Sequence, residues 1–177
     1  ALGALAVWRT AFVLGRRSEA QPLKLAFGGQ PAALDYGRTL ADGALLIYVA
    51  SLGLLLRSHE TAAPAMVVAL VALAFYAAAC LFDRPGLRPA LGLGAALGLL
   101  ALSHQWLIPA TLLLAFIATA ALQSRVLLRW LVATSLPVAL LLVAGWLLAR
   151  QSLVPGADAA QWLAAAPMWS MCACVNS

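Results

Sequence analysis

Two short polar clusters interrupt an otherwise apolar chain, and they carry most of the side chains that could do chemistry. The first cluster is Arg57-Ser58-His59-Glu60, and the second is Ser103-His104-Gln105-Trp106. Imidazole and carboxylate groups can act as bases or bind a divalent metal ion. The candidate metal ligands are therefore His59, Glu60 and His104. Their spacing matches no recognised metal-binding motif, so the alternative is that each cluster is a solvated turn.

The other side chains of the two clusters are suited to binding an anion or a sugar. A guanidinium can hold a phosphate or a carboxylate, which makes Arg57 a candidate phosphate ligand. Gln105 can donate and accept hydrogen bonds, and Trp106 could stack on a sugar ring or anchor the chain at a membrane interface. A single interfacial histidine or tryptophan usually serves solvation and anchoring, so the clusters matter for function chiefly if the fold brings them together.

The composition indicates the class of protein that must position these clusters. Of the 177 residues, 64% are hydrophobic and 10% are charged, whereas soluble domains average about 25% charged residues. This predicts an integral membrane protein. The net charge of +5 is spread over several connecting segments, a pattern that suits membrane topology better than nucleic-acid binding. The sequence contains no catalytic triad motif, P-loop or dinucleotide fingerprint.

The two ends of the chain and its cysteines add a little more. The sequence starts at Ala1 within an apolar stretch and stops at Ser177 without a basic tail. We therefore expect residues 1–177 to be one transmembrane region of a longer protein. Cys172 and Cys174 are too close together to form an easy disulfide, and Cys80 lies in an apolar run, so no disulfide framework is predicted.

Apolar runs separated by polar breaks predict an all-α polytopic transmembrane bundle. A spanning helix needs about 20 mainly apolar residues. The predicted membrane segments, about six in number, are residues 1–15, 41–56, 61–82, 87–103, 106–122 and 126–149. Residues 16–42 are expected to form a loop with an interfacial helix near 31–40, and residues 83–89 a turn, because prolines, glycine and charges disfavour a buried helix there.

The stretch 90–122 determines the topology. As a single helix its 33 residues would be about 50 Å long, against a hydrocarbon core of about 30 Å. The second polar cluster would then lie in the middle of the membrane, where polar groups are costly. We therefore predict a helical hairpin with arms 87–103 and 106–122.

The basic residues test this arrangement. If the connections alternate between the two sides, one side holds eight basic residues: Arg16, Arg17, Lys24, Arg38, Arg84, Arg88, Arg125 and Arg129. The other side holds two, Arg57 and Arg150, and Arg9 lies within a helix. The positive-inside rule then places 16–40, 83–89 and 123–129 in the cytoplasm, and 57–60 and 103–106 on the extracytoplasmic side. Both polar clusters are expected to face that compartment.

Small residues and prolines make further predictions about packing. Ala90, Gly94 and Gly98 form a stripe with four-residue spacing, which favours close packing between helices. Pro64, Pro109 and Pro137 are expected to kink the helices that contain them.

The order of these features resembles bacterial membrane glycosyltransferases of the GT-C superfamily, in particular the protein mannosyltransferase and aminoarabinose transferase-like enzymes. The resemblance runs through 35–42, Arg57-Ser-His-Glu60 and the Gly-rich segment 84–103, and it extends to an apolar helix ending near Trp146. Such enzymes commonly have Lys-Gly after the Gly-rich helix, where this chain has His104-Gln105. His104 could serve a related role.

The resemblance implies a function and a location. It implies an enzyme of the bacterial inner membrane that moves a sugar from a polyprenyl-phosphate donor to an extracytoplasmic lipid, glycan or protein. The catalytic Asp of the family would precede Ala1, so the 177 residues alone are expected to be inactive. Arg57 would neutralise the departing lipid phosphate. His59, Glu60 and His104 would shape the site or bind a divalent metal ion.

Two alternatives stay open at the level of the sequence. A transporter or flippase component would also use short helices interrupted by Gly and Pro. A non-catalytic membrane subunit would pack through the Ala90–Gly98 stripe. The sequence does not distinguish donor sugars, acceptors or oligomeric states.

Overall fold

The computed structural model describes residues 2–22, 31–56, 62–103 and 107–153, and all regular structure among these residues is helical. The elements are α1 (Leu2–Gly15), a 3₁₀ turn η1 (Ser18–Ala20), α2 (Ala33–Leu56), α3 (Ala62–Asp83), α4 (Leu87–Leu102), α5 (Leu107–Gln123), α6 (Arg125–Trp130), a π-helical turn η2 (Leu131–Ser135) and α7 (Leu136–Leu153). The all-α prediction is confirmed for the described residues.

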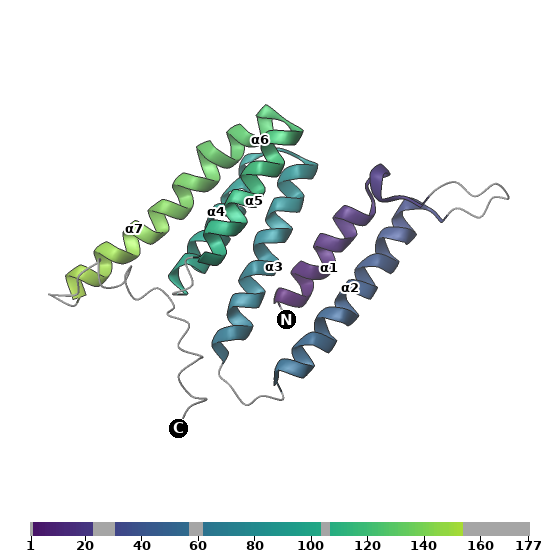
Figure 1. Cartoon of the computed structure of the whole chain (residues 1–177), viewed down its shortest axis with the longest axis horizontal. Helices are drawn as coiled ribbons and strands as arrows, with labels where there is room; N and C mark the ends of the chain where they lie inside the picture. The colour runs from purple at the N-terminus through teal and green to yellow at the C-terminus, as the bar shows by residue number, and fades with distance from the viewer. Residues whose placement is uncertain (1, 23–30, 57–61, 104–106, 154–177) are drawn as a thin grey trace, which may run out of the picture.

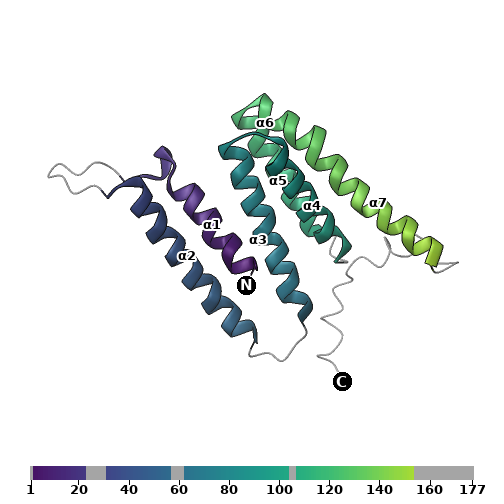
Figure 2. The ribbon, with the colours of Figure 1, turned by 180° about the vertical axis from the view of Figure 1, so that it is seen from behind.

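The helices run alternately up and down, which makes the bundle antiparallel (Figures 1 and 2). Helix α1 packs against α2 and α3, α3 packs against α4, and α4 packs against η2 and α7. Helix α5 contacts α4 and α6. An edge-to-face contact between Phe75 and Phe116, with ring centroids 5.6 Å apart, also joins α3 to α5. The α3–α4–α5 region therefore holds the apolar core, which includes Leu81, Leu93 and Leu97.

The predicted hairpin is present. Helices α4 and α5 are separate and antiparallel, so 90–122 is not one helix (Figure 1). Ser103 closes α4, because both its backbone N–H and its hydroxyl donate to the carbonyl of Leu100, at 3.2 and 2.6 Å. These bonds satisfy a carbonyl that the helix end would otherwise leave without a partner.

Helix α2 corrects the predicted loop over 16–42. It is continuous from Ala33 to Leu56, so there is no separate interfacial helix at 31–40. Its first turns tolerate charge because Asp35 and Arg38, both exposed, form an ion pair at 3.9 Å, and an acidic residue suits a helix N-terminus. Asp42 accepts a hydrogen bond of 2.8 Å from the indole of Trp8, which ties α2 to α1. The polar residues had marked the first turns of the helix, not a loop.

Two helical stretches are long and apolar enough to cross a membrane by length and composition, namely Met66–Asp83 and Arg125–Arg150. Three further apolar helices, α1, α4 and α5, are shorter. The 16 residues of α4 measure about 24 Å along the axis, which is less than a hydrocarbon core of about 30 Å. The six predicted membrane segments thus correspond to helices, but within the described residues only two stretches meet both the length and the composition of a membrane-spanning helix.

Two of the three prolines predicted to kink helices lie in the first turn of a helix, and the third follows a π-helical turn. Pro64 and Pro109 are the third residues of α3 and α5, where a helix has no internal hydrogen bond to lose. Pro137 follows η2, in which the N–H of Leu136 reaches back five residues to the carbonyl of Leu131. The wider π-helical turn lets the helix continue through a residue that has no N–H.

The Ala90–Gly98 stripe packs closely, as predicted, and its partner is the same chain. A Cβ atom added to Gly94 would lie 2.6 Å from the carbonyl oxygen of Ser135, and one added to Gly98 would lie 2.9 Å from Leu142. The fully buried Ser135 hydroxyl donates to the carbonyl of Ala90 at 2.9 Å. We call this contact of α4 with η2 and α7 the glycine seam.

One end of the bundle gathers the basic residues. The C-terminal ends of α1, α3 and α5 meet the N-terminal ends of α2, α4 and α6 there (Figure 1). We call it the basic end, and its described basic residues are Arg16, Arg17, Arg38, Arg84, Arg88, Arg125 and Arg129. At the opposite end, the basic residue among those that the structure describes is Arg150, in the last turn of α7. The basic residues therefore gather at one end of the bundle, as the predicted α4–α5 hairpin requires.

Candidate functional site

The six residues predicted to bind substrate or metal lie outside the described residues. They are Arg57, His59, Glu60, His104, Gln105 and Trp106. Their described neighbours are nevertheless placed. Leu56 ends α2, Ala62 begins α3, Ser103 closes α4 and Leu107 begins α5, all at the end of the bundle opposite the basic end (Figure 1). The structure therefore places the helix ends from which both polar clusters extend at the same end of the bundle.

Of the residues in the two polar clusters, the structure describes Ser103. Its hydroxyl is already engaged with the carbonyl of Leu100, so it acts as a helix cap and not as a nucleophile. Within the described ranges no group of three or more His, Cys, Asp or Glu side chains could hold a metal ion. The predicted metal site, with His59, Glu60 and His104, falls outside those ranges.

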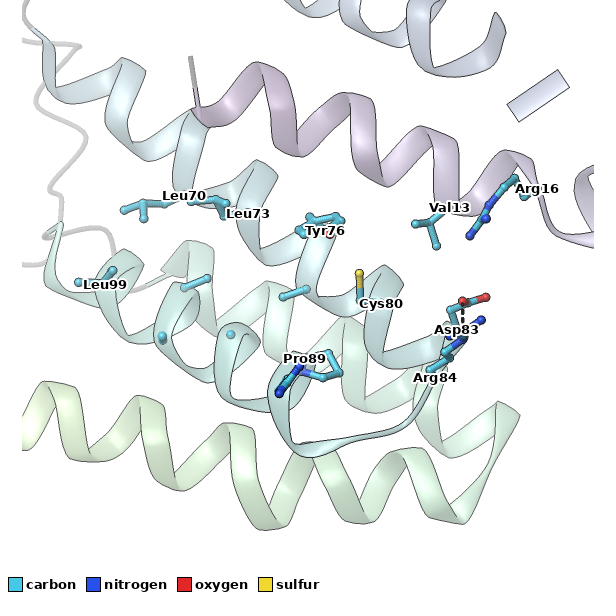
Figure 3. Close-up of a pocket in the computed structure, with 15 residues that line it drawn as sticks. Val13, Arg16, Leu70, Leu73, Tyr76, Cys80, Asp83, Arg84, Pro89 and Leu99 are labelled. Atoms are coloured by element: carbon cyan, nitrogen blue, oxygen red, sulfur yellow. Dashed lines mark ion pairs between the residues drawn. The ribbon is translucent and has the colours of Figure 1, made fainter. Parts of the chain in front are cut away.

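The described residues do form a different site, a groove of about 800 Å³ between α1, α3 and α4. Helix α3 forms its floor, and α1 and α4 form its walls (Figure 3). The apolar part includes Leu70, Leu73 and Ala77 from α3 and Ala95 and Leu99 from α4. We call it the α3 groove.

Helical periodicity explains why these residues share one groove. On α3 the lining residues recur at steps of three or four, at Leu70, Leu73, Tyr76 or Ala77, Cys80 and Asp83. On α4 the same spacing runs through Arg88, Gly92, Ala95 and Leu99. Residues at this spacing lie on one face of a helix. Gly92 and Ala95 have small side chains or none, so α4 does not fill the groove at these positions.

The charged side chains that line the groove lie toward the basic end of the bundle. Arg16, Arg84 and Arg88 line it together with one acidic residue, Asp83, which gives three positive charges against one negative. The Arg84 Nε and Asp83 Oδ2 atoms are 4.0 Å apart, and the Arg84 side chain is 93% exposed. Such an exposed pair is weak. Most of the positive potential at this end therefore remains uncompensated by the described residues.

Two contacts hold the arginines of α1 in place. The Arg16 guanidinium lies 4.8 Å from the centre of the Phe12 ring. This cation–π contact uses the flat face of the guanidinium, and its N–H donors point outward in the guanidinium plane. Arg17 donates to the carbonyl of Ala79 at 3.4 Å, which connects the end of α1 to α3. A second, smaller hollow of about 370 Å³ shares Val13, Arg16, Asp83 and Arg84 with the groove.

The groove offers a charged end and an apolar length, the two parts that an amphiphile needs. Its titratable side chains other than arginine are Tyr76, Cys80 and Asp83, and Figure 3 shows Asp83 directed to Arg84 at the charged end, away from Tyr76. No described histidine lines it. An anionic head beside the arginines and an apolar tail along Leu73 and Leu99 would satisfy the two chemically distinct parts of this site.

Sequence reasoning missed this groove. It treated 83–89 as a solvated turn, and it interpreted the small residues of α4 only through Gly94 and Gly98, which face the opposite side. The signal was the second small-residue face of the same helix, Gly92 and Ala95, headed by Arg88 at the same helical spacing. That the facing helices would be α1 and α3 required the tertiary structure.

Comparison of the chain with protein-family models, with curated proteins and with solved structures finds no match. The resemblance to GT-C glycosyltransferases therefore stays a prediction from the sequence.

Proposed function

We propose that this chain is a membrane-embedded helical bundle that forms part of a glycosyltransferase acting on a polyprenyl-phosphate sugar. The observation that carries the proposal is the common placement of the α2–α3 and α4–α5 junctions at the end opposite the arginines (Figure 1). A reaction centre formed by both polar clusters needs this placement. Had α4 and α5 been one helix, the second cluster would have lain in the middle of that helix and not at this end.

The outer surface supports the membrane part of the proposal. On the peripheral helices α2 and α7, Leu46 and Ile47 are each 71% exposed and Leu141 is 70% exposed. Large apolar patches of this kind are unfavourable in water and mark an interaction with another protein or a membrane. Hydrocarbon would solvate them without cost, and the basic end would face the cytoplasm under the positive-inside rule.

In this proposal the residues of the two polar clusters work together on the extracytoplasmic side of a bacterial inner membrane. Arg57 neutralises the lipid phosphate that leaves when the sugar is transferred. Gln105 and Trp106 hold the sugar, and His59, Glu60 and His104 shape the site or bind a divalent metal ion. The base that activates the acceptor hydroxyl comes from outside these 177 residues, so the chain alone binds the donor but does not transfer the sugar.

The glycine seam bears on one of the alternatives. A non-catalytic subunit assembling through the Ala90–Gly98 stripe needs that stripe on its surface, but Gly94 and Gly98 are buried against η2 and α7 of the same chain. Loss of assembly on changing Gly94 would therefore reflect loss of the fold. The stripe supplies no surface for a partner.

Photo-crosslinking of the donor tests the proposal. A polyprenyl-phosphate sugar carrying a photoreactive sugar is added to membranes that contain the chain, and labelling is compared between the original chain, Arg57→Ala and Arg125→Ala. We expect Arg57→Ala to reduce labelling about tenfold, the effect of losing one charge-assisted hydrogen bond, and Arg125→Ala to leave it unchanged. Equal labelling of all three proteins would overturn the donor site. Sugar transfer by the 177-residue chain alone would refute the expectation that this chain is inactive by itself.

A further inference from the structure

We propose that the α3 groove binds an anionic diacyl phospholipid from the membrane leaflet on the basic side, with its phosphate held by Arg16, Arg84 and Arg88. The site lies at the opposite end of the bundle from the predicted donor site, so it is separate from sugar transfer. It rests only on the membrane embedding proposed above. The lipid would be a bound component of the bundle and not its substrate.

The first argument is charge complementarity. The three arginines line the groove from two walls and its floor: Arg16 follows α1, Arg84 follows α3, and Arg88 is in the first turn of α4. Asp83 offsets only one of these charges. Guanidinium groups bind phosphate through paired hydrogen bonds, and basic pockets between membrane helices on the cytoplasmic side bind anionic lipid headgroups.

The second argument is the length of the groove. From Asp83 at the charged end to Leu70 at the far end, the groove follows 14 residues of α3, a rise of about 20 Å along the helix. Half of a hydrocarbon core is about 15 Å. The groove thus begins at the level of the headgroups and ends near the middle of the membrane, which is the depth of one acyl chain in one leaflet.

The third argument is the shape of the walls. Gly92 is exposed and a Cβ added there would meet only Ala77, at 3.7 Å, an ordinary contact. Leu99 is 46% exposed, although it lines the groove together with Leu70 and Leu73. An acyl chain lying on α3 beside Leu99 would cover apolar surface that this side chain leaves exposed.

Native mass spectrometry of the purified 177-residue chain tests this site. The chain is reconstituted in nanodiscs of phosphatidylcholine with a minor share of phosphatidylglycerol, released, and examined for retained lipid. We expect phosphatidylglycerol to be retained in preference to phosphatidylcholine. The Arg16/Arg84/Arg88→Gln variant should lose this preference, by roughly fivefold for each arginine.

The matched control removes three charges from the same end of the bundle outside the groove. Arg38, Arg125 and Arg129 do not line the groove, so the Arg38/Arg125/Arg129→Gln variant should keep the preference. Equal losses in both triple variants would overturn the groove and indicate a diffuse attraction of the basic end for anionic lipid. Retention of polyprenyl phosphate in place of phosphatidylglycerol would also overturn the proposed occupant.

A second variant separates the lipid from a free phosphate ion. Gly92→Leu places a side chain in the groove beside Ala77 and keeps all three arginines. It should reduce retention of phosphatidylglycerol at least tenfold while the affinity for inorganic phosphate stays as it was. If Gly92→Leu leaves lipid retention unchanged, the acyl chain does not lie in the groove.

Alkaline extraction of the original chain from membranes distinguishes the two proposals. Release of the chain by alkali would defeat the membrane embedding, whereas a chain that stays in the membrane and shows no lipid preference would defeat only this site.

Discussion

The two faces of α4 contrast with each other. On one face Gly94 and Gly98 bring the backbone of α4 against η2 and α7, closely enough that a Cβ added at Gly94 would be 2.6 Å from a carbonyl oxygen. On the other face Gly92 has only Ala77 within contact distance and borders a groove of about 800 Å³. The same residue type closes one interface and borders an open groove at the other, because η2 and α7 approach Gly94 and Gly98 closely whereas α3 lies at an ordinary contact distance from Gly92.

The contrast teaches that a glycine stripe has no fixed meaning. Small residues allow helices to approach, and whether they form a seam or a groove depends on what lies opposite. The glycine seam is secured by the Ser135–Ala90 hydrogen bond. The groove is bordered by α1, which is held at a distance from α4 by α3. One face of α4 therefore serves the fold, and the other face can serve binding.

The largest effect is expected at the seam. Gly94→Leu forces a side chain against Ser135 and Val138, and such overpacking costs about 1 to 3 kcal/mol or more. Gly92→Leu adds the same side chain two residues away and should change stability by less than about 0.5 kcal/mol. Thermal unfolding of the two variants in the same detergent measures the difference. Similar loss of stability in both would show that the two faces do not differ.

A smaller effect is expected from the hydrogen bond across the seam. Ser135→Ala removes the donor to the carbonyl of Ala90 but keeps the small volume, so we expect a loss of about 1 kcal/mol. Denaturation of Ser135→Ala beside Ser152→Ala checks this, since the Ser152 hydroxyl bonds only within its own helix, to Ala149. An unchanged midpoint for Ser135→Ala would mean that glycine packing alone holds the seam.

The smallest effect is expected at the wall of the groove. Arg17 reaches the carbonyl of Ala79 at 3.4 Å, longer than the usual range of about 2.7 to 3.2 Å, so Arg17→Gln should cost only about 0.5 kcal/mol. Hydrogen exchange of the last turn of α3 should rise in this variant, and exchange in α7 should not. Faster exchange in α7 would contradict the separation of the two faces.

The sequence was sufficient for most of the helical architecture. Polar residues at 103–106 and the excess length of 90–122 predicted the α4–α5 hairpin, because buried polar groups and an overlong helix are both costly in a membrane. The charges at Asp35, Arg38 and Asp42 misled the prediction for α2. Their partners explain the error, since Trp8 is 34 residues away from Asp42 in the sequence and could not be paired with it beforehand.

The candidate site was less predictable than the fold. The polar clusters stood out because few residues of the chain are polar, but they lie outside the described residues. The α3 groove is made of common residues such as Leu, Ala and Gly, which carry no chemical signal by themselves. Arg84 and Arg88 had been assigned to the turn 83–89 and Arg16 to the loop 16–42, and only the packing of α1 and α4 on α3 shows that they share one groove.

The most direct test of the account is the sidedness of the two ends of the bundle. Cys80, Cys172 and Cys174 are replaced by Ser, single cysteines are introduced as Ser58→Cys, Ser103→Cys, Ser18→Cys and Gln123→Cys, and a membrane-impermeant maleimide is added to intact spheroplasts. The account predicts labelling at 58 and 103 from outside, and labelling at 18 and 123 only after the membrane is opened. Labelling of positions 103 and 123 from the same side would contradict it, because α5 would then not cross the membrane between them.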